Sequence, residues 1–230
     1  LPARAGEPFS FEIRATDPND NRDPSNASLV YLSPETGGGL EFSLTPDFAS
    51  TITQTQLVNG SAVIYGRGTR AGSWRVDVTS TGPSLTPTFF DAEIAAGTDV
   101  HHYAISVTSP PAAGGDFTLS LLARDQWGNL VETAFYDIDL RAVDPVDTTL
   151  SAPDILSITS GRIEAGSFTE DNLEYETAGL IRVEVSDDST SVVGVSPVID
   201  VPPAEAYQLA ELRGDTTGIA AGDSVLLEVL

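Results

Sequence analysis

Residues 113–121, Ala-Gly-Gly-Asp-Phe-Thr-Leu-Ser-Leu, decide the fold because their pattern occurs three times in the chain. Ala-Gly-Glu-Pro-Phe-Ser-Phe-Glu-Ile at 5–13 and Ala-Gly-Asp-Ser-Val-Leu-Leu-Glu-Val at 221–229 are the other copies, each 108 residues away. Every copy begins with an Ala-Gly turn signal and continues with apolar residues at alternate positions. This is the period of a β-strand that buries one face. We therefore expect a tandem repeat of one β-rich unit.

A second block supports the repeat: residues 71–78, Ala-Gly-Ser-Trp-Arg-Val-Asp-Val, match residues 178–185, Ala-Gly-Leu-Ile-Arg-Val-Glu-Val, at an offset of 107. About seven short strands in a unit of about 107 residues is typical of an immunoglobulin-like Greek-key sandwich. We therefore predict an all-β chain of tandem immunoglobulin-like Greek-key β-sandwiches. The other strand candidates are residues 40–44, 51–58, 61–65, 88–94, 103–107, 133–140, 155–160, 192–201 and 207–212.

The repeat also predicts the boundaries of the units. Repeat 1 spans 1–98 and lacks the leading strand that the other copies carry, repeat 2 spans 99–203, and 204–230 supplies the first strands of a third repeat. Two explanations remain open. The chain is either a segment of a longer repeat array, or its C-terminal strands complete the first unit of an identical subunit and build a filament by strand exchange. The expected partners are neighbouring repeats or identical subunits.

Composition narrows the function. The chain has 34 acidic residues and 11 basic residues, all of them Arg, which gives a net charge of −23. This charge repels nucleic acids and anionic membranes, but it can recruit divalent cations. No apolar run approaches the length of a membrane helix, so we expect no membrane insertion. The chain has no Cys, which excludes disulfides, thiolate metal sites and Cys nucleophiles.

One segment resembles a known family. Residues 123–129, Ala-Arg-Asp-Gln-Trp-Gly-Asn, are similar to the Ala-x-Asp-x-x-Gly-Asn segment of bacterial immunoglobulin-like repeats of the invasin and intimin kind. In repeat 1 the aligned stretch, residues 15–21, has Asp20 in place of the Gly. The resemblance implies an extracellular, cell-surface module that acts as a structural spacer or as an adhesin.

The richest polar loop is a candidate cation site. Ca²⁺ takes six to eight oxygen ligands, and alternating Asp and Asn residues in one loop can supply several of them. We therefore consider Ca²⁺ a possible ligand of this loop, against a solvated turn whose side chains cap their own backbone. The residues concerned are Asp17, Asn19, Asp20, Asn21 and Asp23.

Other candidates suggest binding rather than catalysis. Trp127 lies in a turn and could stack on a glycan, whereas Trp74 aligns with Ile181 in a repeated strand and is expected in the core. Asn26 and Asn59 fit the N-glycosylation pattern. His101 and His102 are expected to be exposed linker residues. No Ser lies in a nucleophile-elbow pattern and no carboxylate pair is singled out, so we expect no enzymatic activity. A glycan or a surface protein bound by the sandwich loops is the adhesin alternative.

Overall fold

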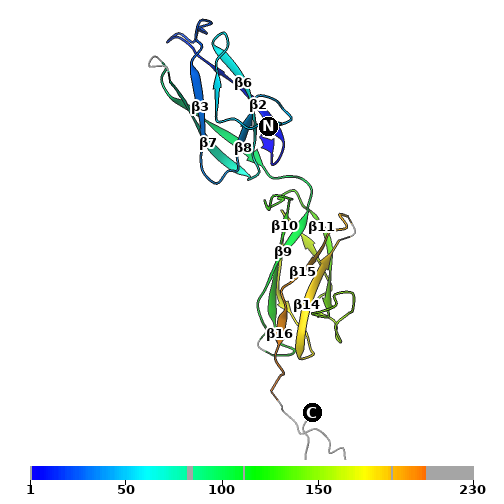
Figure 1. Cartoon of the computed structure of the whole chain (residues 1–230). Coiled ribbons are helices and arrows are strands. Elements are labelled where there is room, and N and C mark those ends of the chain that lie inside the picture. The colour runs from blue at the N-terminus through cyan, green and yellow to red at the C-terminus, as the bar shows by residue number, and fades with distance from the viewer. Residues whose placement is uncertain (1, 82–84, 111, 188, 206–230) are drawn as a thin grey trace, which may run out of the picture.

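The computed structural model describes residues 2–81, 85–110, 112–187 and 189–205, which form two β-sandwiches placed end to end (Figure 1). We call residues 2–95 the N-terminal sandwich and residues 102–201 the C-terminal sandwich. The described residues contain no helix, so the predicted all-β class is confirmed. The described residues therefore hold no helix that could span a membrane.

The N-terminal sandwich consists of a five-stranded and a three-stranded sheet. The repeated apolar strand of the sequence is β2, which pairs along its whole length with β6 in antiparallel register. The first sheet has the order β1 (Ala3–Arg4), β8 (Thr88–Ala95), β7 (Gly72–Ser80), β3 (Leu29–Pro34), β5 (Gln54–Gln56), and the second has the order β2 (Pro8–Arg14), β6 (Ser61–Arg67), β4 (Glu41–Ser43).

The C-terminal sandwich repeats this plan, with β10 in the place of β2 and β14 in the place of β7. Here the repeated apolar strand β10 has a neighbour on each side, β13 and β9. One sheet has the order β13 (Ser167–Leu173), β10 (Phe117–Arg124), β9 (His102–Val107). The other has the order β12 (Ser160–Ile163), β11 (Tyr136–Val143), β14 (Gly179–Ser186), β15 (Val193–Val195), and β16 (Ile199–Val201) also pairs with β14.

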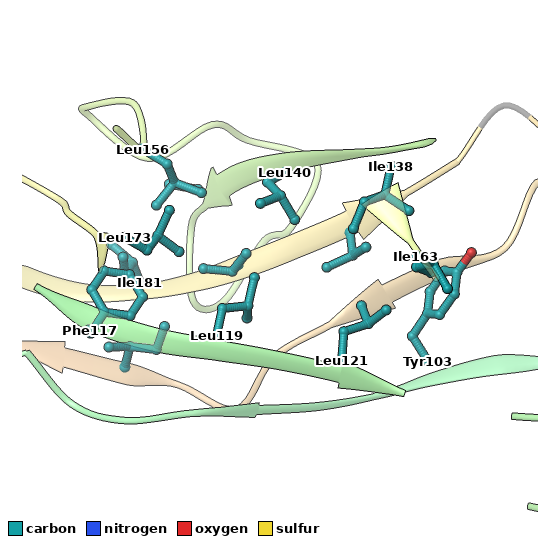
Figure 2. Packing of buried hydrophobic residues seen from close by; sticks show 14 of the residues in the cluster. Tyr103, Phe117, Leu119, Leu121, Ile138, Leu140, Leu156, Ile163, Leu173 and Ile181 are labelled. Atoms are coloured by element: carbon teal, nitrogen blue, oxygen red, sulfur yellow. The ribbon is translucent and has the colours of Figure 1, made fainter. Parts of the chain in front are cut away.

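The two cores differ in how completely they are closed. Phe117, Leu119 and Leu121 of β10 are at most 2% exposed, and Figure 2 shows them packed beneath the side chains of the opposite sheet. The equivalent residues of β2 are only half-buried. The reason is that β9 covers one edge of β10, whereas no strand among the described residues pairs with that edge of β2. Strand exchange at this edge stays a prediction, because the proposed donor, residues 207–230, lies outside the described residues.

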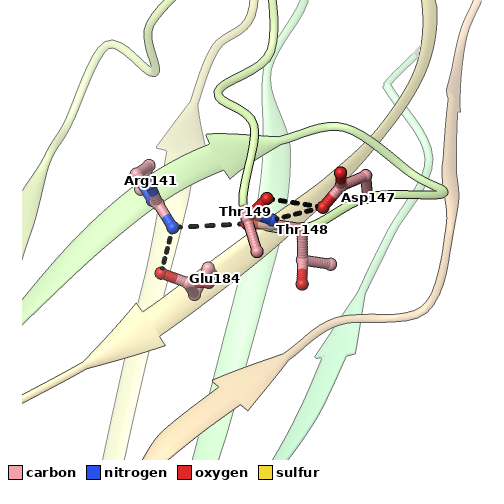
Figure 3. Close-up of polar contacts among 5 residues, drawn as sticks. All are labelled: Arg141, Asp147, Thr148, Thr149 and Glu184. Atoms are coloured by element: carbon pink, nitrogen blue, oxygen red, sulfur yellow. Dashed lines mark hydrogen bonds and ion pairs between the residues drawn. The ribbon is translucent and has the colours of Figure 1, made fainter.

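The loop that follows β11 is fixed to the C-terminal sandwich by polar contacts (Figure 3). The Arg141 guanidinium donates to Glu184 Oε1 at 2.7 Å and to the Thr148 carbonyl at 3.4 Å. Asp147 Oδ1 accepts from the Thr149 backbone N–H at 3.1 Å and from its hydroxyl at 2.6 Å. Arg141 is about half exposed, so its ion pair positions the loop and contributes little to stability.

Several local predictions need correction. The predicted strand 155–160 is a loop up to Thr159, and its Ile155 is 76% exposed. Trp74 is only partly buried, unlike its aligned residue Ile181, because its ring lies over Gly38 and its Nε1–H donates to the Arg70 carbonyl at 2.9 Å. The strands β3 and β13 were not predicted. The predicted strand at 207–212 and the third repeat copy at 221–229 lie outside the described residues.

Candidate functional site at the junction of the sandwiches

The two sandwiches are joined by residues 96–101, between the end of β8 and the start of β9. This short linker is held by its backbone: the His101 N–H donates to the Arg124 carbonyl at 2.7 Å, and the Gly97 N–H donates to Asp125 Oδ2 at 2.9 Å. Short connections of this kind leave the adjoining ends of the sandwiches in contact. We call the loop of residues 125–129, which follows β10 and faces the N-terminal sandwich, the clamp loop.

Asp125 organises the clamp loop from inside. Its Oδ1 accepts the backbone N–H groups of Trp127 and Asn129, each at 2.9 Å, and its Oδ2 accepts Asn129 Nδ2 at 2.9 Å besides the Gly97 N–H. The residue is 2% exposed, and a buried carboxylate is tolerated only when its oxygens are hydrogen-bonded. Asp125 therefore shapes the loop and binds the linker with the same carboxylate.

Asn129 connects the loop to the N-terminal sandwich. Its Oδ1 accepts the Ala71 backbone N–H at 2.9 Å, and its Nδ2 donates to the Thr69 carbonyl at 2.9 Å and to Asp125 Oδ2. Both amide hydrogens and the amide oxygen are thus used. The N-terminal sandwich contributes only backbone atoms to these contacts, which come from the turn that precedes β7.

Trp127 adds an apolar contact to the junction. A Cβ atom on Gly6 would lie 2.9 Å from Trp127 Nε1 and 3.2 Å from Cε2, so the ring packs directly against the Gly6 backbone. The φ of Gly6, 82°, is also one that favours glycine. The other side of the ring remains open, since Trp127 is 44% exposed and borders a cleft of about 420 Å³. Polar residues that line this cleft include Arg4, Glu7, Thr98, Asp99, His101 and Gln126.

The electrostatics of Asp125 favour the closed junction. Burial raises the pKa of this carboxyl, but hydrogen bonds from the Asn129 side chain and from the N–H groups of Gly97, Asn129 and Trp127 outweigh burial and hold the pKa below its ordinary value. The charged form therefore binds the linker near neutral pH. The nearest basic residue in sequence, Arg124, donates to the Gly128 carbonyl at 2.6 Å and closes the loop from the other side.

The predicted calcium loop has the same internal hydrogen bonds. Asp17 accepts the backbone N–H groups of Asn19 and Asn21, each at 2.9 Å, and the Asn21 side-chain amide at 3.1 Å. These bonds lower the pKa of Asp17, with the Asn21 side chain as the main cause. Asp20 has a φ of 65°, as Gly128 has 84°, so Asp replaces Gly without changing the turn.

Calcium binding at this loop stays a prediction. Asp23 does not share the hydrogen bonds of Asp17. Its Oδ1 accepts the Ser25 backbone N–H at 3.0 Å and the Ser25 hydroxyl at 2.6 Å. In the part of the chain that the structure describes, no three His, Cys, Asp or Glu side chains gather in a way that could hold a metal ion.

The remaining predicted residues lie apart from the junction or at its margin. Asn26 is partly buried and its Oδ1 accepts the Ser28 N–H at 3.0 Å, whereas Asn59 is exposed in the turn before β6, with a φ of 53°. Glycosylation at either stays a prediction. His101 and His102 are exposed, with ring centroids 6.0 Å apart.

Asp187, directly after β14, is a buried polar residue that the sequence did not single out. It is 6% exposed, accepts a short hydrogen bond from the Tyr103 hydroxyl, and accepts the Thr190 hydroxyl at 2.5 Å. Burial and the bond to Asp187 raise the pKa of Tyr103. This contact ties β9 to the loop after β14. No local pattern around Asp187 signals this contact, because Tyr103 lies 84 residues away in the sequence.

The fold of the chain is similar to that of intimin domains. The D00-D0 domain of Intimin matches with 12% identity and a TM-score of 0.43, covering 87% of this chain and 96% of that one. Domains 5-6 of the S-layer protein SbsC match with 14% identity, a TM-score of 0.30 and coverages of 89% and 94%. The Yersinia pseudotuberculosis adhesin InvE matches with 13% identity, a TM-score of 0.34 and coverages of 87% and 56%.

With identities of 12–14%, these matches concern the fold only. A β-glucuronidase from Bacteroides uniformis also matches, and the chain covers 23% of it. No protein-family model and no curated protein matches the chain.

Proposed function

We propose that the chain is a non-catalytic structural module of an extracellular repeat-array protein at a cell surface, such as a stalk, filament or surface layer. In this proposal residues 1–98 and 99–203 are successive repeats, and 204–230 begins a third. The function is to set the spacing and the angle between units. Its partners are then neighbouring repeats.

The observation that carries this proposal is the double contact made by Asn129 and Asp125. Three hydrogen bonds, each of 2.9 Å, join the clamp loop to Thr69, Ala71 and Gly97. A flexible linker would leave these polar groups to water. Instead, they are paired. The bonds to Thr69 and Gly97 are partly buried, and leaving a buried partner unpaired costs about 1–3 kcal/mol, whereas the bond to Ala71 is exposed. The chain thus uses side chains of one sandwich to fix the orientation of the other.

The proposal is tested by measuring the distance between the sandwiches. Because the chain has no Cys, the double variant Ser33→Cys and Thr169→Cys can be spin-labelled at two exposed strand positions, one in each sandwich. We expect a narrow distance distribution that broadens when Asp125→Ala and Asn129→Ala are added. The matched control is Asp17→Ala with Asn21→Ala, which removes the same loop bonds at the far end of the N-terminal sandwich. A distribution that is broad before any loop change would contradict the proposal.

An adhesin that binds a glycan beside the junction is the second candidate, supported by the open face of Trp127 over a cleft with polar walls. An exposed aromatic face next to hydrogen-bonding groups suits a sugar ring. A glycan array tests this candidate: it predicts reproducible binding by the chain that is lost in Trp127→Ala and kept in Trp74→Phe. An array without binding by the unmodified chain would argue against it.

A further inference from the structure

Each sandwich has a clamp loop at one end, and the two loops are the same structure. Asp17 N–H donates to the Asn21 carbonyl at 2.9 Å, as Asp125 N–H donates to the Asn129 carbonyl at 3.0 Å. The Asp side chain accepts the N–H groups two and four residues later in both loops, at 2.9 Å in every case. The two loops thus agree atom by atom at an offset of 108 residues.

The loops differ in what lies beyond them. Asn129 Oδ1 and Asn129 Nδ2 each bond to a backbone group of the N-terminal sandwich, and Asp125 Oδ2 bonds to the Gly97 N–H of the linker. The corresponding atoms of Asp17 and Asn21 have no partner outside their own loop among the described residues, and both side chains are exposed. The loop at 17–21 therefore presents, fully formed, the polar groups that hold the junction at 125–129.

The partner of a clamp loop is the opposite end of a sandwich, which we call the receiving end. For the N-terminal sandwich it consists of the Thr69 carbonyl and the Ala71 N–H, together with the Gly97 N–H of the linker that follows. The C-terminal sandwich builds the same end: Gly114 N–H donates to the Tyr175 carbonyl at 3.0 Å, as Gly6 N–H donates to Gly68 at 2.7 Å. Gly179 also has a φ of 141°, close to the 138° of Gly72.

We propose that the loop at residues 17–21 is a docking surface for the receiving end of a further sandwich of this kind, held by Asp17 and Asn21 as Asp125 and Asn129 hold the N-terminal sandwich. The inference rests on the proposed function, since it extends one observed junction to a second. Every contact that the docking needs is of a kind that the chain already makes at the observed junction. The added sandwich would contribute one backbone carbonyl and one backbone N–H group, and its linker would contribute a second N–H group.

A three-sandwich chain tests the docking surface. Residues 1–109 are joined in front of residue 2 of the full chain, because Pro110 and Pro2 occupy equivalent positions at the offset of 108. The added copy supplies a receiving end and a linker of native length. It also supplies a strand like β9 beside β2. One spin label is placed at Ser33→Cys of the added copy and the other at Val63→Cys of the original N-terminal sandwich. These two positions are equivalent to those of the Ser33 and Thr169 pair at the observed junction. The reason is that Val63 faces Glu12 across the sheet as Thr169 faces Ser120.

We expect the two label pairs to give the same mean distance and equally narrow distributions. Asp17→Ala with Asn21→Ala in the original N-terminal sandwich should broaden only the distance distribution of the new pair. Asp125→Ala with Asn129→Ala should broaden only that of the Ser33 and Thr169 pair. A new pair that is broad, or that is narrow but unaffected by the Asp17 and Asn21 changes, overturns the docking surface while the original junction remains intact. A broad Ser33 and Thr169 pair would instead overturn the proposed function.

Discussion

Asn129 and Thr69 belong to different sandwiches, and the side-chain amide of Asn129 donates to the Thr69 backbone carbonyl at 2.9 Å. The same amide accepts from the Ala71 N–H, so one side chain spans two backbone groups of its neighbour. Such paired bonds fix an orientation more strongly than one bond does, because both must stretch when the sandwiches rotate.

Replacing Asn129 with Ala should release the Ala71 amide. This bond is exposed, so its loss costs about 0.5–1.5 kcal/mol, which corresponds to roughly two- to ten-fold faster hydrogen exchange at Ala71 if exchange follows local opening of the junction. Residue-resolved exchange measured by NMR checks this. Asn21→Ala is the control and should leave the exchange at Ala71 unchanged. Equal exchange rates in Asn129→Ala and the unmodified chain would show that the bond does not hold the junction.

The junction should open in acid. Because the pKa of folded Asp125 is lowered, the stabilisation from its carboxylate is complete above the unfolded value of about 3.9. It is lost as the pH falls through the lower, folded value. Carboxyl ¹³C NMR should place the Asp125 midpoint below the ordinary range, and the label distances should broaden over the same pH interval. In Asp125→Asn that acid-dependent step should be absent. A midpoint above the ordinary range would contradict this assignment.

Gly6→Ala should disturb the junction through Trp127. The added methyl would lie 2.9 Å from Trp127 Nε1, whereas in Gly114→Ala it would meet only the flexible end of Glu176, at 3.0 Å. Both glycines have positive φ, so each change carries a backbone cost of about 1 kcal/mol. Only Gly6→Ala should also change the fluorescence of Trp127, measured in a Trp74→Phe background. Identical spectra for the two variants would refute the packing of the ring on Gly6.

The two sandwiches should melt separately, with the N-terminal one first, because β2 is half-buried where β10 is buried. Calorimetry should resolve two transitions. Leu119→Ala should destabilise the C-terminal sandwich by about 2–5 kcal/mol and lower only the upper transition, and Ile64→Ala should lower only the lower one. Thr169→Ala, on an exposed strand face, is the control. A single transition that both core variants shift equally would mean that the junction couples the cores completely.

The repeated apolar strands β2 and β10 and the class of the fold could be predicted from the sequence, since alternation over a buried face is a local signal. The strand β13 could not, because its residues 167–173 are mostly polar and half-exposed beside β10. The clamp was missed for a related reason. Asn129 contacts residues about 60 positions away, and no local pattern reports such a distance. The recurrence of Asp and Asn four residues apart in both repeats was the signal available, and we interpreted it as turn chemistry and a cation site.

The receiving end makes its hydrogen bonds to the clamp loop with main-chain atoms alone, and this affects how the sequences of such chains can evolve. Thr69-Arg70-Ala71 before β7 corresponds to Glu176-Thr177-Ala178 before β14, so the side chains at this turn already differ between the two sandwiches. The side chains of this turn can therefore change in evolution while the hydrogen bonds of the junction are kept. Units whose surfaces differ can thus keep the same junction, provided that the Asp and the Asn of the clamp loop and the glycine beneath Trp127 are kept.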